Sequence, residues 1–134
     1  MNEPTWIDDR EAVALQERLI ALFGGLAGGV RDENLFRAAL GRPLNKWHYD
    51  EPRPDLFLLA AAYAFGIAKG HVFHDGNKRT AHAVAAVFLE NNGWEHAADE
   101  AETVSIMVAV ADGSMTEGEL AAWFRATSRK ISGI

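Results

Sequence analysis

The segment from residue 55 to residue 69 constrains the fold most, because it is apolar on nearly every face. Its only polar side chains are those of Asp55, Tyr63 and Lys69. A helix that is hydrophobic all round is buried, so this segment is predicted to form the central helix of a domain. No apolar run in the chain approaches the roughly 18 residues that indicate a membrane-spanning helix.

Helical periodicity also dominates the rest of the chain, and no alternation of β-branched residues is long enough to require a sheet. Gly41 and Pro43 are expected to end the second helix, and residues 42–54 are expected to form an irregular crossover. The prediction is a single all-α domain over residues 1–134, a compact bundle of about six helices built around a central pair. The other segments predicted to be helical are 10–23, 32–40, 77–91, 100–111 and 116–128.

Composition and charge are those of an ordinary globular protein, with 49% hydrophobic and 24% charged residues. Cysteine is absent, which excludes disulfides, thiolate metal ligands and cysteine nucleophiles. The net charge of −6 does not favour broad nucleic-acid binding. The N-terminus has neither the basic start nor the apolar stretch of a signal peptide. We therefore expect a cytoplasmic protein that binds neither nucleic acid nor membranes.

The densest group of reactive side chains lies between the two central helices, in the sequence HVFHDGNKR at residues 71–79. The start of a helix favours an anion, and Gly76 there lets a phosphate approach the backbone. Lys78 and Arg79 add positive charge, and Arg79 can bind phosphate oxygens through two N–H groups. Asp75 could hold a divalent metal, and His71 is placed as a general base. These are the parts of a phosphoryl- or nucleotidyl-transfer site.

Each of these residues also has a purely structural interpretation. Asp75 could simply be the N-cap of the following helix, and a loop histidine such as His74 is usually structural or solvated. Lys78 and Arg79 lie near the positive end of the helix dipole, which costs some tenths of a kcal/mol of stability. This cost makes a purely structural role less favoured for them. The glycine-rich run at residues 24–29 lacks the spacing of a phosphate loop, so we interpret it as a flexible turn.

The sequence HVFHDGNKRTA resembles the H-x-F-x-[DN]-[AG]-N-K-R signature of the Doc (death on curing) toxins, the compact branch of the Fic superfamily. Similarity extends upstream through LIALFGGLAGGVRDENLFRAALGRP and downstream through VFLENNG, and so covers roughly residues 12–95. The resemblance implies a Fic/Doc-type helical fold with the active-site loop between the central helices, and ATP and Mg²⁺ as cofactors. It also implies a toxin controlled by a Phd-like antitoxin, whose C-terminal helix lies in a groove beside the active site.

The same resemblance implies a reaction and residue roles. Doc proteins act as kinases that phosphorylate a threonine of translation elongation factor Tu and arrest translation, whereas Fic relatives generally transfer AMP to a hydroxyl group. By matching positions, His71 would deprotonate the target hydroxyl and Asp75 would hold Mg²⁺. The matched phosphate-binding positions are Gly76, Asn77, Lys78 and Arg79. Lys69 lies two residues before His71, and from that position it is either a further phosphate-binding cation or a solvated helix end.

Two positions depart from the wider Fic pattern HPFxxGNGRxxR. Lys78 stands where that pattern has its second loop glycine, and His82 stands where it has its second arginine. That arginine helps to orient the triphosphate for attack at the α-phosphate, so its loss favours phosphorylation over AMP transfer. AMP transfer and a non-catalytic, antitoxin-binding Doc homologue remain as alternatives.

A metal-dependent phosphohydrolase of the HD type is an alternative from a different class. The chain has a His74-Asp75 dipeptide, an upstream His48 and downstream acids at Asp99 or Asp112. Such enzymes need the His-Asp pair on a helix that faces a metal, whereas this dipeptide is followed by a glycine and a helix entrance. The sequence therefore favours the transfer site.

Overall fold

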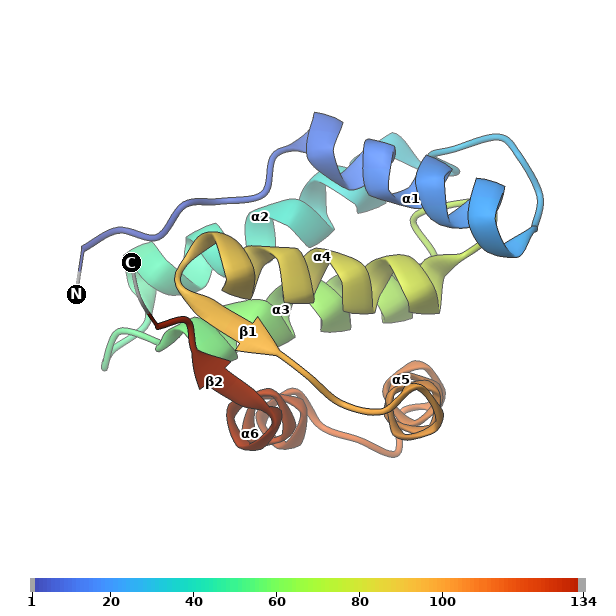
Figure 1. Ribbon diagram of the computed structural model, residues 1–134. Coiled ribbons are helices and arrows are strands. Elements are labelled where there is room, and N and C mark those ends of the chain that lie inside the picture. Colours follow the sequence, from blue (N-terminus) through green and yellow to red (C-terminus); the bar gives the residue numbers. More distant parts are fainter. Residues whose placement is uncertain (1, 133–134) are drawn as a thin grey trace.

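The computed structural model describes residues 2–132, which form a bundle of six α-helices with one short two-stranded sheet (Figure 1). This confirms the predicted all-α class. The helices are α1 (Asp9–Phe23), α2 (Glu33–Tyr49), α3 (Leu56–Gly70), α4 (Asn77–Asn91), α5 (Glu100–Asp112) and α6 (Glu117–Thr127). The strands, which pair antiparallel, are β1 (Trp94–His96) and β2 (Ser128–Lys130).

Helix α3 is the centre of the bundle, as its apolar sequence predicts. Helices α2, α4, α5 and α6 all pack against it, and its side chains from Leu59 to Ala64 are fully buried. Because four of those six residues are alanines, the neighbouring helices can approach α3 closely. No helix within residues 2–132 has both the length and the apolar character needed to cross a membrane.

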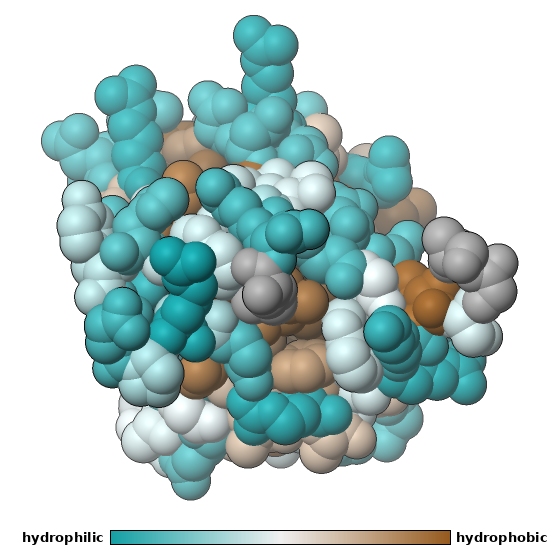
Figure 2. All heavy atoms as spheres, turned by 90° about the vertical axis from the view of Figure 1, so that its left-hand side faces the viewer, coloured by the Kyte–Doolittle hydropathy of each residue, from teal (hydrophilic) through white to brown (hydrophobic). Residues whose placement is uncertain are grey.

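One face of the bundle is mostly polar where it meets solvent (Figure 2). On the face that lies at the left of Figure 1, hydrophilic side chains dominate and apolar side chains show only as smaller patches between them (Figure 2). Scattered apolar surface of this kind is usual for globular proteins.

The second helix is longer than predicted. Helix α2 continues through Gly41 and Pro43 to Tyr49, so the expectation of an irregular crossover is wrong for residues 42–49. A proline inside a helix costs about 3 kcal/mol, because it removes one backbone hydrogen bond and clashes with the preceding turn. Trp47, one turn later, is buried and packs edge-on against the Trp6 ring. Burial of this large side chain offsets the cost and keeps the chain helical.

The sheet is the other difference from the sequence prediction. Each strand has three residues, with Trp94 opposite Lys130 and His96 opposite Ser128. Strands this short show no alternation that a sequence pattern could reveal. The remaining helix boundaries agree with the prediction to within one residue.

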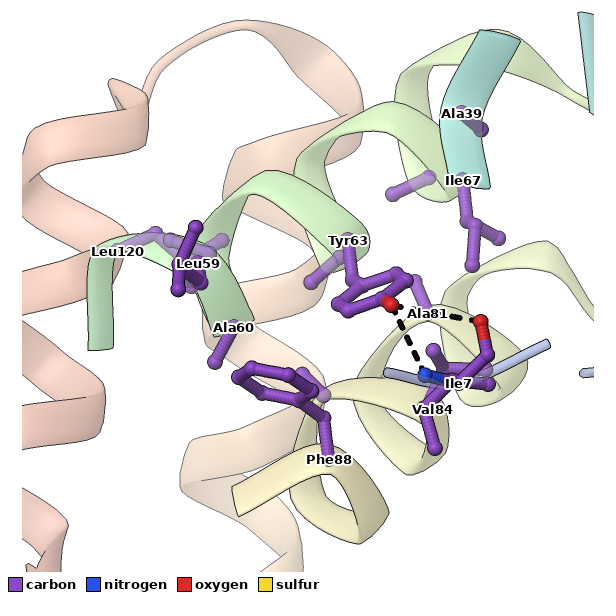
Figure 3. Close-up of a cluster of buried hydrophobic side chains, with 14 of the residues drawn as sticks. Ile7, Ala39, Leu59, Ala60, Tyr63, Ile67, Ala81, Val84, Phe88 and Leu120 are labelled. Atoms are coloured by element: carbon purple, nitrogen blue, oxygen red, sulfur yellow. Dashed lines mark hydrogen bonds between the residues drawn. The ribbon is translucent and has the colours of Figure 1, made fainter. Parts of the chain in front are cut away.

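Tyr63 ties the segment that precedes α1 to the central helix (Figure 3). Its hydroxyl accepts a hydrogen bond from the Ile7 N–H at 3.0 Å and donates one to the Ile7 carbonyl at 3.3 Å. Both residues are buried. Burial raises the pKa of the Tyr63 phenol to about 12, so the hydroxyl stays protonated and keeps both bonds.

We expect Tyr63→Phe to lower the free energy of unfolding by about 1–3 kcal/mol, because two buried backbone groups of Ile7 lose their partner. The measurement is the urea midpoint, with an unchanged m-value. Tyr49, which is 81% exposed, gives the matched control Tyr49→Phe. Equal midpoints for the two variants would contradict this account of Tyr63.

Candidate active site

A cleft of about 700 Å³ lies between the start of α4, the end of α1 and one side of α5. Its polar wall is the loop that joins α3 to α4, together with the first turn of α4. The opposite walls are mostly apolar, and they include Leu19 and Phe23 from α1 and Val104 and Met107 from α5. The predicted site residues in the cleft are His71, Asp75, Gly76, Asn77, Lys78 and Arg79.

The N-terminus of α4 differs from that of the other five helices between residues 2 and 132. Its N-cap is Gly76, which has a positive φ of 75° and offers no side-chain cap. The Thr80 N–H donates to the Gly76 carbonyl at 2.9 Å as the first turn closes, which leaves the N–H groups of residues 77–79 without an intrahelical partner and open to a ligand. The residues whose side chains cap the other helices are Asp8, Asp32, Asp55, Asp99 and Thr116.

The Asp75 carboxylate lies at this open helix end but does not cap it, because Gly76 is the N-cap. One oxygen accepts the Gly76 N–H at 2.8 Å, and the other accepts the Leu26 N–H at 2.9 Å. The bond from Leu26, followed by that from Gly76, holds the pKa of this carboxyl below its usual range, with smaller contributions from Lys78 and Arg79. The purely structural interpretation of Asp75 as an N-cap is therefore wrong.

The donor set around Asp75 fits Mg²⁺ bound together with phosphates. Each carboxylate oxygen accepts one N–H bond and so keeps a lone pair for a metal. Mg²⁺ typically takes one or two carboxylates and completes its octahedron with phosphate oxygens and water. Within residues 2–132, no three His, Cys, Asp or Glu side chains come together as a metal cage, which is what an HD-type phosphohydrolase would need.

His71 and Asn77 lie at the two ends of the loop. His71 is exposed and adopts a left-handed conformation, with φ 48° and ψ 51°, where α3 ends. Asn77 accepts the Phe73 N–H and donates to the Phe73 carbonyl, both at 3.0 Å. The Asn77 side chain therefore closes the loop, and its backbone N–H is the group left for a phosphate.

The cations are placed differently from one another. Lys78 and Arg79 lie in the cleft, and the Arg79 guanidinium stands 4.5 Å from the centre of the Phe23 ring. Lys69 is not among the cleft residues: its ammonium lies 5.5 Å from the Phe65 ring centre and beside Gly113, in the turn between α5 and α6. The structure therefore brings two of the three predicted cations together and leaves Lys69 apart.

The glycine-rich segment at residues 24–29 is not the free turn that the sequence suggested. Besides the Leu26 bond to Asp75, the Gly29 carbonyl accepts the His74 N–H at 3.0 Å. In both contacts the glycine-rich segment uses backbone groups and the partner lies more than 40 residues away, so no side-chain pattern in the segment indicated them.

His82 lines the cleft one turn after Arg79. The motif did not predict its surroundings, because its neighbours come from other parts of the chain. Its ring lies 5.0 Å from that of His96 and also packs near Trp123 and Phe124. Burial, followed by the effect of His96, lowers the pKa of His82 to about 4. His82 is therefore neutral at pH 7.

The depressed pKa of His82 makes stability depend on pH. Between about pH 6.5 and pH 4 the unfolded state binds the proton and the folded state does not, so stability falls as the pH is lowered. A shift of this size corresponds to at most about 3 kcal/mol of stability.

We expect His82→Leu to make this loss smaller when the free energy of unfolding is measured at pH 7 and at pH 5. The control His48→Gln, at an exposed position, should keep the full loss; an unflattened profile in His82→Leu would contradict the assignment.

Comparison with known proteins agrees with the geometry of the site. The sequence profile of the Fic/DOC family matches residues 6–89, which include α1, α2, α3 and the whole loop. The chain is 36% identical over 115 residues to "Protein kinase doc" of Escherichia phage P1, covering 86% of this chain and 89% of that protein. It is 44% identical over 91 residues to "Toxin Doc" of Mycolicibacterium smegmatis, covering 68% of each. This chain therefore belongs to the Fic/DOC family.

Proposed function

We propose that this protein is the toxin of a toxin–antitoxin system and an enzyme that transfers the terminal phosphate of ATP to a protein hydroxyl group. The observation that carries the proposal is the uncapped start of α4, which opens into a cleft beside Lys78, Arg79 and Asp75. The names of two relatives, "Protein kinase doc" and "Toxin Doc", support the same reading.

The phosphates of ATP would lie against the first turn of α4. Free N–H groups and the positive end of the helix dipole favour their charge, and Gly76 has no side chain to keep them away. Lys78 adds a point charge, and Arg79 offers two N–H groups while its guanidinium rests on the Phe23 ring. Mg²⁺ held by Asp75 would neutralise part of the phosphate charge when bound.

His71 would act as the general base, because histidine is the side chain best suited to this task near neutral pH. Its imidazole takes the proton of the target hydroxyl as that oxygen bonds to the terminal phosphorus. The bond from this phosphorus to the bridging oxygen breaks, and ADP leaves. His71 lines the same cleft as Arg79, so base and phosphate clamp face a common space.

Attack at the terminal phosphate is favoured over AMP transfer by the state of His82. The wider Fic pattern has an arginine at this position, whereas His82, whose pKa burial lowers to about 4, is neutral at pH 7. The cleft therefore lacks one cation that would orient the α-phosphate, and it gains Lys78 in the cradle. AMP transfer to a protein hydroxyl is the second candidate, since the same helix start could hold an α-phosphate.

The resemblance to Doc toxins supplies the proposed partners. The acceptor would be a threonine of translation elongation factor Tu, whose modification arrests translation. A Phd-like antitoxin would inhibit the toxin by placing its C-terminal helix in a groove beside the cleft. A non-catalytic, antitoxin-binding role is the alternative, and a measurement of transfer activity distinguishes it from the proposed kinase.

The first test is the intact mass of elongation factor Tu after incubation with this protein, ATP and Mg²⁺. We expect a gain of about 80 Da, the mass of one phosphoryl group. A gain of about 329 Da would establish AMP transfer and contradict the interpretation of His82. An unchanged mass, with toxin that binds ATP, would contradict elongation factor Tu as the acceptor.

Replacing the general base should separate binding from chemistry. We expect His71→Gln to lower kcat by at least about 100-fold while ATP binding stays unchanged, because proton transfer contributes 10²–10⁴-fold and the phosphate cradle is intact. The assays are phosphate transfer and calorimetric titration with ATP. His48→Gln, at an exposed position that does not line the cleft, is the control, and full activity of His71→Gln would exclude His71 as the base.

A further inference from the structure

The segment between α1 and α2 lies along the motif loop as a short antiparallel pair. Val30 forms a backbone bridge with Phe73, and the Arg31 N–H donates to the Val72 carbonyl at 2.8 Å. The same segment contacts both ends of the loop, where His71 and Asp75 lie. Its conformation therefore bears on the two residues assigned to proton transfer and metal binding.

We propose that residues 25–31 position the catalytic loop, with the Arg31 side chain holding the backbone of His71 and the Leu26 N–H orienting the Asp75 carboxylate. The proposal rests on the function proposed above, because that function assigns His71 and Asp75 their roles. Arg31 and Leu26 act through these residues and are positioning residues.

The Asp75 end is held by hydrogen bonds from two residues outside the motif. Leu26 donates its N–H to one carboxylate oxygen at 2.9 Å, and the buried Gln16 side chain donates to the Asp75 carbonyl at 3.2 Å. The close approach requires Gly25, whose φ is +136°: a Cβ there would stand 2.7 Å from Ile20 Cδ1 and 2.8 Å from the Asp75 carboxylate oxygen. A larger residue at position 25 would therefore strain the backbone and displace the Ile20 side chain and the Asp75 carboxylate, which weakens the bond from Leu26.

Leu26 serves this contact through its backbone. Its side chain is 69% exposed, so it buries little apolar surface and adds little to the core. The hydrogen bond to Asp75 is therefore the feature of this residue that bears on the site.

The His71 end is held by the Arg31 side chain. His71 is the one non-glycine residue between positions 2 and 132 with a positive φ, a conformation that is unfavourable for any residue with a Cβ. Its carbonyl accepts the Arg31 Nε–H at 2.7 Å. Arg31 is exposed and takes part in none of the ion pairs found among the described residues. Its side chain is therefore available to stabilise the left-handed turn at His71.

The first test measures the loop itself by amide hydrogen exchange and needs no activity. We expect Arg31→Ala and Gly25→Ala to speed exchange in residues 72–76 by at least about 10-fold, with protection of α6 unchanged. Arg37, an exposed arginine of α2 that forms an ion pair with Glu33, gives the control Arg37→Ala. Gly93, also at positive φ but with nothing within 4 Å of an added Cβ, gives the control Gly93→Ala. Unchanged exchange in both loop variants would overturn the proposal.

The second test uses the transfer reaction and distinguishes the two ends. We expect Arg31→Ala to lower kcat at least about 10-fold with an unchanged KM for ATP, because the base is displaced while the cradle is intact. Arg31→Lys, which keeps an N–H donor, should restore part of kcat. Gly25→Ala should instead raise the Mg²⁺ concentration needed for half-maximal rate by about 10-fold, as loss of support for a metal ligand does.

The outcomes separate this proposal from the proposed function. If the wild-type protein transfers no phosphate but the variants still exchange faster, the positioning role of residues 25–31 is supported and the kinase activity is rejected. An active wild type with variants of equal kcat and Mg²⁺ requirement would reject the positioning role and keep the kinase. If Gly25→Ala unfolds at a lower denaturant concentration than Gly93→Ala, the exposed Arg31 variants decide the question alone.

Discussion

The burial of α3 is the constraint on which the rest of the structure depends. A helix that is apolar on every side must be covered on every side, and α2, α4, α5 and α6 supply that cover. The chain leaves α3 at Gly70 and enters α4 at Asn77, so the short loop between them emerges directly from the core. The polar loop therefore has rigid helices at both ends, a suitable support for catalytic groups.

At the start of α4, local stability conflicts with the proposed function. The helix has no side-chain cap and carries Lys78 and Arg79 next to the positive end of its dipole, whereas each of the other five helices described has an acidic or hydroxyl cap. The ionised Asp75 carboxylate offsets part of this charge and accepts the Gly76 N–H. A negatively charged ligand at this position would offset the remaining positive charge. Locally unfavourable features of this kind are expected at functional sites.

The candidate site could be predicted because its chemical groups are contiguous in sequence, from His71 to Arg79, and because helix periodicity placed them at a helix start. What could not be predicted depends on contacts between distant segments. Helix α2 passes Pro43 because Trp47 is buried against the N-terminal segment, and Lys69 turns away toward Gly113. The segment 25–31 contacts the loop mainly through backbone groups, so its residue types alone did not predict the contacts, although Gly25 and the Arg31 side chain take part in them.

The charge in the cleft also depends on residues outside the part of the chain that matches the family profile. That match ends at residue 89, whereas the rings that bury His82 belong to His96 in β1 and to Trp123 and Phe124 in α6. These rings bury His82 and lower its pKa to about 4, so at pH 7 the cleft has two cations at the helix start and a neutral imidazole one turn later. The loop thus supplies the charged groups at the start of α4, while β1 and the aromatic rings of α6 determine the surroundings of the histidine one turn later.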